Sequence, residues 1–352
     1  MADQGDKPRA ATEPAGVRSI DQFTGPLFIV GMPRSGTKLL RDLLNQHPSI
    51  GLPVGESHFV VPMVRRFGER PDFEDAAERR RFYDALRSTG FFAYMHAQGL
   101  VFEPAQLEQV AARTSWCSVL ETIFRHYGQT PEGGVWGDTT PQQLLHIELL
   151  KTLCPGARFI HIIRDPRDRC LSVRKKFGTS ILRTAERWRR NVGRARQAGV
   201  SLGDGYCEVS YEALVSQPRE TLEPLARHLG LSFTEAMLRP GRVTEQSGEA
   251  RGRTEILIGN SGKYLTQLRP KEIRRIEEIT FPLLGPLGYV PRHASTFRPL
   301  GAAAMFGLTA TDALMMLSIH VRKDGLFRGL RRWRGQGLRW WRNELRAGSG
   351  HG

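Results

Sequence analysis

The stretch FIVGMPRSGTKLL, residues 28–40, decides the fold of this 352-residue chain. The apolar run at residues 27–30 predicts a buried parallel strand, and leucines follow at the spacing of a helix: Leu39, Leu40, Leu43 and Leu44. Between strand and helix lies a turn of glycine, proline and serine. A strand, a glycine-containing loop and a helix in this order can cradle a phosphate group, because backbone N–H groups and the helix N-terminus point at the anion.

The spacing from Gly31 to Gly36 equals that of the nucleotide-triphosphatase loop G-x-x-x-x-G-K-[ST], but the next two residues differ from it. Thr37 stands in place of the loop lysine, and Lys38 stands in place of the Ser/Thr that binds Mg²⁺. The basic residue inside the loop is Arg34, which suits a phosphate or sulfonate group bound without a metal. A P-loop small-molecule kinase stays as an alternative.

Residues 33–37, PRSGT, resemble the 5′-phosphosulfate loop P-[KR]-S-G-T-[TS] of the sulfotransferases that use 3′-phosphoadenosine 5′-phosphosulfate (PAPS). The resemblance is to the bacterial and tyrosylprotein branch, and it covers roughly residues 25 to 290. It implies an α/β fold with a P-loop-like central parallel sheet flanked by helices. It also implies the residues that hold the 5′-phosphosulfate: Arg34, Ser35, Gly36, Thr37 and Lys38.

A second match lies at residues 158–172, RFIHIIRDPRDRCLS. The apolar strand ends at Arg164, Pro166 starts the next helix, and Asp165 is expected to be a turn or cap residue. The 3′-phosphate site of the family is an arginine at the strand end with a serine eight residues further on. The resemblance therefore assigns Arg164 and Ser172 to the 3′-phosphate, and arginine and hydroxyl donors suit that anion.

Two further segments resemble the nucleotide-binding parts of the family. Tyr211 lies in a V-x-Y-E segment whose tyrosine packs beside the adenine, although a core position would suit it equally. The late motif G-x-[KRW]-[WY] implies that three residues fold over the 3′-phosphate and adenine: Gly262, Lys263 and Tyr264. We expect the polar, glycine-rich residues 240–260 to form a mobile lid over the cofactor.

The loop at residues 47–59 is expected to carry the catalytic base. Sulfuryl transfer to a hydroxyl group needs a group that accepts the proton of the acceptor, and a carboxylate or an imidazole can do so. Gly55 and Glu56 resemble the G-E-[ST] element in which the glutamate is the proposed base. We therefore assign Glu56 as the base and keep His58 as the second choice, while a solvated loop carboxylate is the alternative for Glu56.

Residues 135–141, VWGDTTP, resemble the element W-G-[DE]-K-T-P, with one departure. Thr139 stands where the family often has a lysine that neutralises charge on the leaving phosphate. We hypothesise that Lys38 replaces this lysine and acts with Arg34 on the transition state. The alternative is that Lys38 faces solvent. Thr140 before Pro141 predicts an N-cap with proline at the first helical position.

Residues 60–128 predict a mainly helical insertion over an acceptor pocket. Five residues could line this pocket or belong to the core: Phe91, Phe92, Tyr94, Met95 and His96. The expected function is transfer of a sulfuryl group from PAPS, by metal-free in-line displacement, to a hydroxyl of a carbohydrate, lipid or other metabolite. An amphiphilic acceptor such as a glycolipid becomes the favoured one if the chain touches a membrane.

The composition limits the remaining choices. The formal net charge of +15 favours anionic ligands or surfaces, and we expect no nucleic-acid partner. The four cysteines show neither a metal-binding spacing nor a disulfide framework. They predict a reduced, cytoplasmic protein without a metal site. Residues 1–24 lack the apolar segment of a signal peptide and predict a disordered lead.

Residues 291–352 predict a basic extension beyond a sulfotransferase domain at residues 25–290. From residue 292 onwards, eleven Arg/Lys residues face three acidic residues, and several tryptophans follow a marginally apolar stretch at 300–321. Such a helix could lie on an anionic membrane surface, at the inner face, or pack on the domain. With Thr139 in place of lysine, a non-catalytic nucleotide-binding protein recruited to membranes is a further alternative.

Overall fold

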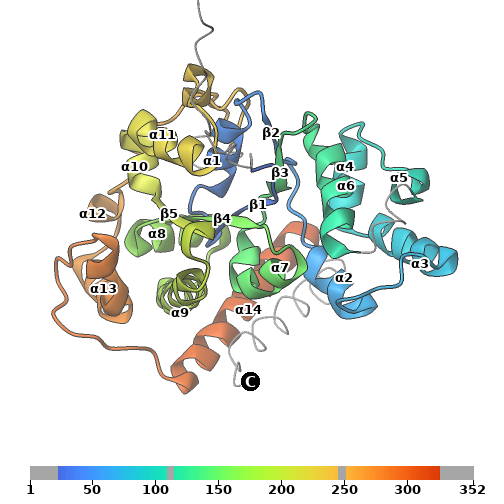
Figure 1. Cartoon of the computed structure of the whole chain (residues 1–352). Coiled ribbons are helices and arrows are strands. Elements are labelled where there is room, and N and C mark those ends of the chain that lie inside the picture. The colour runs from blue at the N-terminus through green and yellow to red at the C-terminus, as the bar shows by residue number, and fades with distance from the viewer. Residues whose placement is uncertain (1–22, 109–114, 245–250, 326–352) are drawn as a thin grey trace, which may run out of the picture.

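The computed structural model describes residues 23–108, 115–244 and 251–325, and its centre is a five-stranded parallel sheet (Figure 1). The strand order is β2-β3-β1-β4-β5, so β1 lies in the middle. The strands span Leu27–Gly31 (β1), Ile50–Gly51 (β2), Val135–Asp138 (β3), Arg158–Ile163 (β4) and Tyr206–Ser210 (β5). All of the pairings are parallel. The predicted fold class is confirmed.

Alternate side chains of β1 enter two different hydrophobic clusters. Leu27 and Ile29 pack with the leucines of α1, whereas Phe28 and Val30 pack with the helices of the opposite face. The four side chains are fully buried, and burial of one such side chain is worth about 1.5–3 kcal/mol. Because both faces are covered, β1 has a continuous apolar sequence, as expected for a central parallel strand.

Helices cover both faces of the sheet (Figure 1). On one side lie α1 (Thr37–Leu44), α10 (Tyr211–Ser216) and α11 (Pro218–His228). On the other side lie α7 (Ile147–Leu153), α8 (Pro166–Phe177) and α9 (Ile181–Val200). Short 3-10 helices join these elements: η1 (Pro141–Leu145), η2 (Gly203–Gly205) and η3 (Glu235–Leu238). The carboxyl ends of β1 and β4 therefore open into loops that lie between the two helical layers.

The predicted helical insertion is confirmed, and it lies beside β3 (Figure 1). Its helices are α2 (Val60–Phe67), α3 (Ala76–Arg87), α4 (Gly90–Ala97), α5 (Pro104–Glu108) and α6 (Trp116–Gly128). Aromatic side chains hold these helices together. The tilted rings of Phe59 and Phe91 have centroids 5.3 Å apart, and Phe91 meets Tyr127 edge to face at 5.2 Å. Residues 109–114 lie outside the described residues.

The end of the described chain packs on the domain. It contains α12 (Tyr264–Gln267), α13 (Pro270–Leu284), η4 (Gly285–Leu287) and α14 (Ala302–Asp324). In α14 the buried Asp312 accepts hydrogen bonds from the Arg183 guanidinium at 2.5 Å and from the Ser180 N–H at 2.8 Å. Asp312 thus ties α14 to the start of α9. Residues 1–22 of the predicted disordered lead and the tryptophan-rich residues 326–352 lie outside the described residues.

None of the helices in residues 23–108, 115–244 and 251–325 is both long enough and apolar enough to cross a lipid bilayer.

Two predictions from local sequence need correction. The helix after β3 begins at Pro141 with Thr140 at the N-cap position, as predicted, but it is the 3-10 helix η1 and the Thr140 side chain makes no capping bond. Its hydroxyl instead accepts the N–H of Ser57 at 2.6 Å. The prediction that the cysteines form no disulfide is also wrong, because Cys117 in α6 and Cys154 after α7 are bonded to each other. Their separation of 37 positions in the sequence concealed this tertiary pairing.

Candidate active site

The loop between β1 and α1 has an unusual backbone. Arg34 and Gly36 both adopt left-handed conformations, with φ of 73° and 98°. A Cβ atom on Gly36 would lie 2.4 Å from the ring of Tyr211, so only glycine lets the tyrosine pack against the loop. This geometry leaves the first N–H groups of α1 at the mouth of the loop, where they can bind an anion.

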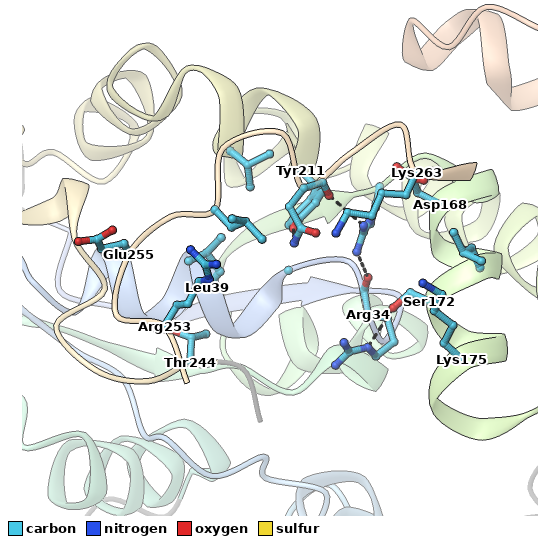
Figure 2. Close-up of a pocket in the computed structure, with 16 residues that line it drawn as sticks. Arg34, Leu39, Asp168, Ser172, Lys175, Tyr211, Thr244, Arg253, Glu255 and Lys263 are labelled. Carbon is cyan, nitrogen blue, oxygen red and sulfur yellow. Dashed lines mark hydrogen bonds between the residues drawn. The ribbon is translucent and has the colours of Figure 1, made fainter. Parts of the chain in front are cut away.

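Residues from two strand ends converge at this loop (Figure 2). Arg34 Nε donates a hydrogen bond to Ser172 Oγ in α8 at 3.3 Å. Arg164, directly after β4, donates through Nη1 to the carbonyl oxygen of Arg34 at 3.2 Å. The Arg164 guanidinium also lies 4.3 Å from the ring centroid of Tyr211. The predicted 5′-phosphosulfate residues and the predicted 3′-phosphate residues therefore belong to one site.

The loop that carries the late motif, residues 260–264 (the late loop), is held at the same site by residues that the sequence did not indicate. Asn260 Nδ2 donates to the Tyr211 hydroxyl at 2.7 Å, and the Asn260 carbonyl accepts from Arg164 at 3.2 Å. Asp168 in α8 accepts the backbone N–H groups of Gly262 and Tyr264 at 2.5 and 2.9 Å. Burial raises the pKa of Asp168 and these two hydrogen bonds oppose the rise. Asn260 and Asp168 therefore position the late loop.

The late-loop residues differ in how they meet the site. Lys263 and Arg164 line the same cavity, and Figure 2 shows Lys263 near Asp168. Gly262 instead contributes its backbone to the contact with Asp168. The structure does not bring the ring of Tyr264 to the cavity. That ring is buried against Arg167, whose guanidinium lies 4.4 Å from the ring centroid. Tyr264 thus packs in the core below the loop.

The cavity at this point contains about 910 Å³ of open space, part of it continuous with solvent. Its basic side chains are Arg34, Arg164, Lys175, Arg253 and Lys263, and its acidic side chains are Asp168 and Glu255. Such an excess of positive charge in a cleft attracts an anion. Sequence motifs did not indicate Lys175 or Arg253, because neither belongs to a short pattern with a known anion contact.

Glu56 lies between two basic side chains. Lys38 Nζ is 3.3 Å from Glu56 Oε1, and His58 Nε2 is 3.1 Å from Glu56 Oε2. Burial by itself would raise the pKa of Glu56, but the hydrogen bond to His58 and the charge of Lys38 outweigh it, so the net pKa is lowered. Glu56, the second-choice base His58 and the predicted catalytic residue Lys38 therefore lie together, and Lys38 is directed towards Glu56.

A second cavity continues from the first, since both are lined by Arg34, Gly36 and Thr244. Glu56, His58 and Lys38 lie along its wall. Two of the five residues weighed for an acceptor pocket also line it, Phe91 and Tyr94. Phe92 and Met95 are buried in the hydrophobic core instead, and His96 is exposed outside this cavity.

Buried polar groups lie under the loop that carries Glu56. Asp138, Thr139 and Thr140 at the end of β3 are almost completely buried. Burial raises the pKa of Asp138 to about 6, and hydrogen bonding to Ser57 and Thr140 opposes this rise. Thr139 is therefore not in contact with solvent, and its short side chain supplies no charge at the place where a lysine is often found in the resembling family.

Comparisons with known proteins agree with this arrangement. A protein-family sequence model described as "Sulfotransferase family" matches residues 26–235 of this chain. The zebrafish (Danio rerio) protein "Protein-tyrosine sulfotransferase 1" is 23% identical over 286 residues, which cover 76% of this chain and 73% of the relative. The chicken (Gallus gallus) "Protein-tyrosine sulfotransferase 2" is 23% identical over 283 residues, covering 75% and 69%.

The structure also resembles the solved "Sulfotransferase Domain from the Curacin Biosynthetic Pathway". The TM-score is 0.50 at 19% sequence identity, and the match covers 77% of this chain and 100% of that domain. At this identity the likeness concerns the fold alone.

The predicted location in the cytoplasm, at the inner face of a membrane, is wrong. It conflicts with the likeness to animal protein-tyrosine sulfotransferases. Its premise of reduced cysteines also fails, because Cys117 and Cys154 form a disulfide, a bond that is rare in the cytosol.

Proposed function

We infer the reaction from one premise: the chain belongs to the PAPS-dependent sulfotransferase family and is an enzyme of that class. We propose that it transfers the sulfuryl group of PAPS to a hydroxyl acceptor at the site described above. The observation that supports this best is the Arg34–Ser172 hydrogen bond, which joins the loop after β1 to the helix after β4. It brings the proposed 5′-phosphosulfate and 3′-phosphate residues together.

The residues present fit such a donor substrate. Within residues 23–108, 115–244 and 251–325, the buried atoms Ser35 Oγ and Arg164 Nε have no hydrogen-bond partner. Buried polar groups are normally paired, so two unpaired donors beside Lys263 and Arg34 suit the oxygens of an anion. We assign the 5′-phosphosulfate to Arg34, Ser35, Gly36, Thr37 and Lys38. We assign the 3′-phosphate and nucleoside to Arg164, Ser172, Tyr211, Gly262 and Lys263.

Glu56 acts as the base in this proposal. PAPS supplies the sulfuryl group, whose bond to the phosphate oxygen is exchanged for a bond to the acceptor oxygen. The Glu56 carboxylate takes the proton of the acceptor hydroxyl, and its lowered pKa keeps it ionised at neutral pH. His58 holds one of its oxygens, and Lys38 lies beside the other.

Lys38 and Arg34 supply the positive charge that the reaction requires. Charge develops on the leaving phosphate oxygen, and a fixed cation in a cleft stabilises it. Because Thr139 supplies no charge, we assign this role to Lys38 together with Arg34, without a metal. The hydrogen-bonding distance between Lys38 and Glu56 supports the assignment, since it keeps Lys38 at the wall shared by the loop and the second cavity.

The acceptor is proposed to bind in the second cavity. Phe91, Tyr94 and Phe177 line this cavity together with Glu56, so it suits a hydroxyl on a molecule with an apolar part. A glycolipid or another amphiphilic metabolite has that character, as does the tyrosine named in the curated relatives. We keep the carbohydrate, lipid or metabolite class as the proposal, and tyrosine is the competing acceptor in any screen.

We further propose that the domain ends near residue 290 and that the basic extension contacts an anionic membrane surface. Phe306, Leu314 and Met315 of α14 are exposed, and the sequence beyond them is rich in arginine and tryptophan. Exposed apolar side chains beside a cationic segment suit the interface of anionic lipids.

The test of the donor site is calorimetric titration with the product 3′-phosphoadenosine 5′-phosphate in a buffer that contains a chelator. We expect wild type to bind, and the double variant Arg164→Ala with Ser172→Ala to lose binding. Arg174→Ala is the control, because Arg174 lies on the same helix and bonds Glu272 instead. A folded wild-type protein that binds ATP with Mg²⁺ but not this product would return the kinase interpretation.

A further inference from the structure

Arg169 is a buried arginine directly behind the phosphosulfate loop. It lies in the first turns of α8, and its side chain is only 5% exposed. Its Nε donates to the carbonyl oxygen of Pro33 at 3.1 Å, and its Nη1 donates to the carbonyl of Thr184 at 3.4 Å. Both acceptors are neutral backbone groups. In the described parts of the chain no carboxylate forms an ion pair with Arg169.

A neighbour on the same helix shows how unusual this is. Arg167 is equally buried, but it pairs with Asp165 at 2.7 Å and with Glu277 at 2.6 Å. These two carboxylates outweigh burial and raise the pKa of Arg167. Burial lowers the pKa of Arg169 to about 10, and the nearby Arg187 and Arg164 add to the lowering. Arg169 therefore remains charged at neutral pH, and retaining an unpaired buried charge is costly.

The contact with Pro33 fixes the direction of the loop. A peptide group is planar and trans, so its C=O and N–H bonds point in opposite directions. The hydrogen bond from Arg169 orients the Pro33 carbonyl towards α8. The N–H of Arg34 belongs to the same peptide group and therefore points away from α8. Arg164 holds the next carbonyl, that of Arg34. Two buried arginines thus hold successive peptide groups around Arg34. Its φ of 73° is unfavourable for any residue other than glycine, so the surroundings must maintain it.

We propose that Arg169 is a positioning residue of the phosphosulfate loop, and that the anion bound by the loop compensates its charge. The proposal rests on the proposed function, because it requires a 5′-phosphate or phosphosulfate at the loop. Arg169 does not line either cavity. It acts through its contact with Pro33, which orients the Arg34 peptide group, and through its positive charge. Without a bound anion, the buried charge lowers the stability of the protein.

The test compares full-length wild type with Arg169→Met, Arg169→Lys and the control Arg174→Met. Calorimetry uses two ligands, 3′-phosphoadenosine 5′-phosphate and adenosine 3′-monophosphate, which lacks the group that the loop would bind. We expect Arg169→Met to weaken binding of the first ligand by about tenfold or more. Losses of this order are found when residues that orient the ligands of a metal site are removed. Its affinity for adenosine 3′-monophosphate should be unchanged. Arg169→Lys, which keeps the charge but loses the Nε contact, should bind the first ligand with intermediate affinity.

Thermal unfolding separates this role from a structural one. Without ligand, Arg169→Met should melt at or above the wild-type temperature, because an apolar replacement for an unpaired buried charge is often neutral or stabilising. The increase in melting temperature caused by 3′-phosphoadenosine 5′-phosphate should be smaller than in wild type. A less stable or unfolded Arg169→Met protein would overturn the charge compensation. An Arg169→Lys protein that bound both ligands like wild type would overturn the positioning role.

The two ligands also separate this proposal from the proposed function. A folded wild-type protein that bound neither ligand would overturn the proposed function. If wild type bound both ligands and the Arg169 variants bound them equally well, only the proposal for Arg169 would fail.

Discussion

At the scale of single residues, the proposed chemistry depends on the charge state of Glu56. Lys38 and His58 lie beside its two oxygens, and together they lower the pKa of the carboxyl group despite its partial burial. A base with a lowered pKa accepts a proton less readily than one with a pKa near the working pH. The proposed reaction therefore depends on the positive charge of Lys38 and Arg34, which stabilises the leaving phosphate oxygen.

Substitution of the base gives the first prediction at this scale. We expect Glu56→Gln to lower kcat by about 10²–10⁴-fold, the usual contribution of a general base, while the affinity for 3′-phosphoadenosine 5′-phosphate stays the same. Initial rates with radiolabelled PAPS and calorimetry measure the two quantities. His58→Gln is the matched control and should reduce kcat less. A Glu56→Gln enzyme with wild-type turnover would show that the base lies elsewhere.

The pH dependence of the same enzyme follows from the sign of the pKa shift. The pKa of Glu56 is lowered from the ordinary value of 4.5, so its carboxylate persists as the pH falls until that lowered pKa is reached. On the acid side kcat should therefore stay constant down to pH values below 4.5, provided the protein remains folded. An acid limb in wild type at clearly higher pH would indicate another titrating group, and Asp138, with a pKa of about 6, is the first to replace by asparagine.

At the scale of elements, a buried ion pair joins α14 to α9. Asp312 and Arg183 are both almost completely buried and lie 2.5 Å apart. Among the α14 side chains that the structure describes, Thr309, Asp312 and Ala313 are buried, and the others are half-buried or exposed. We therefore expect the packing of α14 on the domain to be sensitive to loss of this ion pair, although the sequence of the helix is largely apolar.

Removal of the carboxylate provides the prediction for this element. We expect Asp312→Ala to lower the free energy of unfolding by about 3–5 kcal/mol, because it breaks a buried ion pair and removes the Asp312 carboxylate from the buried charge of Arg183. The double variant Asp312→Leu with Arg183→Met should recover most of this loss. Denaturant unfolding provides the measurement, and Glu223→Ala, which breaks an exposed pair with Arg227, is the control. Equal effects of Asp312→Ala and Glu223→Ala would mean that α14 is held by other contacts.

At the scale of the whole molecule, the positive charge is unevenly distributed. The segment from residue 292 to the end has a net charge of 11 − 3 = +8, out of +15 for the chain. The sequence left open whether this segment packs on the domain or lies on a membrane. The contact of Asp312 supports packing for the first half of α14, and the membrane contact of the remainder stays a proposal.

Deletion of residues 326–352 tests that contact. We expect the full chain to sediment with vesicles that contain anionic lipid, and less so at high salt, because salt screens exposed charges. The truncated chain should stay in solution and retain the sulfation rate for a water-soluble acceptor. Vesicles of neutral lipid are the control. Persistent sedimentation of the truncated chain would contradict the assignment of the contact to this segment.

Local patterns in the sequence predicted much of the framework. The apolar run before Gly31, the loop residues and the strand that ends before Arg164 could be predicted because strand burial, glycine conformation and helix starts depend on neighbours in sequence. The segment after β3 was predicted less well. There the Thr140 hydroxyl accepts a hydrogen bond from the Ser57 N–H, a tertiary contact that competes with the expected N-cap.

The sequence by itself therefore determined the parallel α/β framework and the candidate anion-binding motifs, whose properties are local. Only the tertiary structure decided how those motifs meet: Lys38 with Glu56, Asn260 with Tyr211, and Arg169 with Pro33. It also decided that Cys117 pairs with Cys154 and that Tyr264 enters the core. The physical reason is separation along the chain. Arg169 and Pro33 are 136 residues apart, and only the packing of α8 against the end of β1 brings a buried charge to that carbonyl.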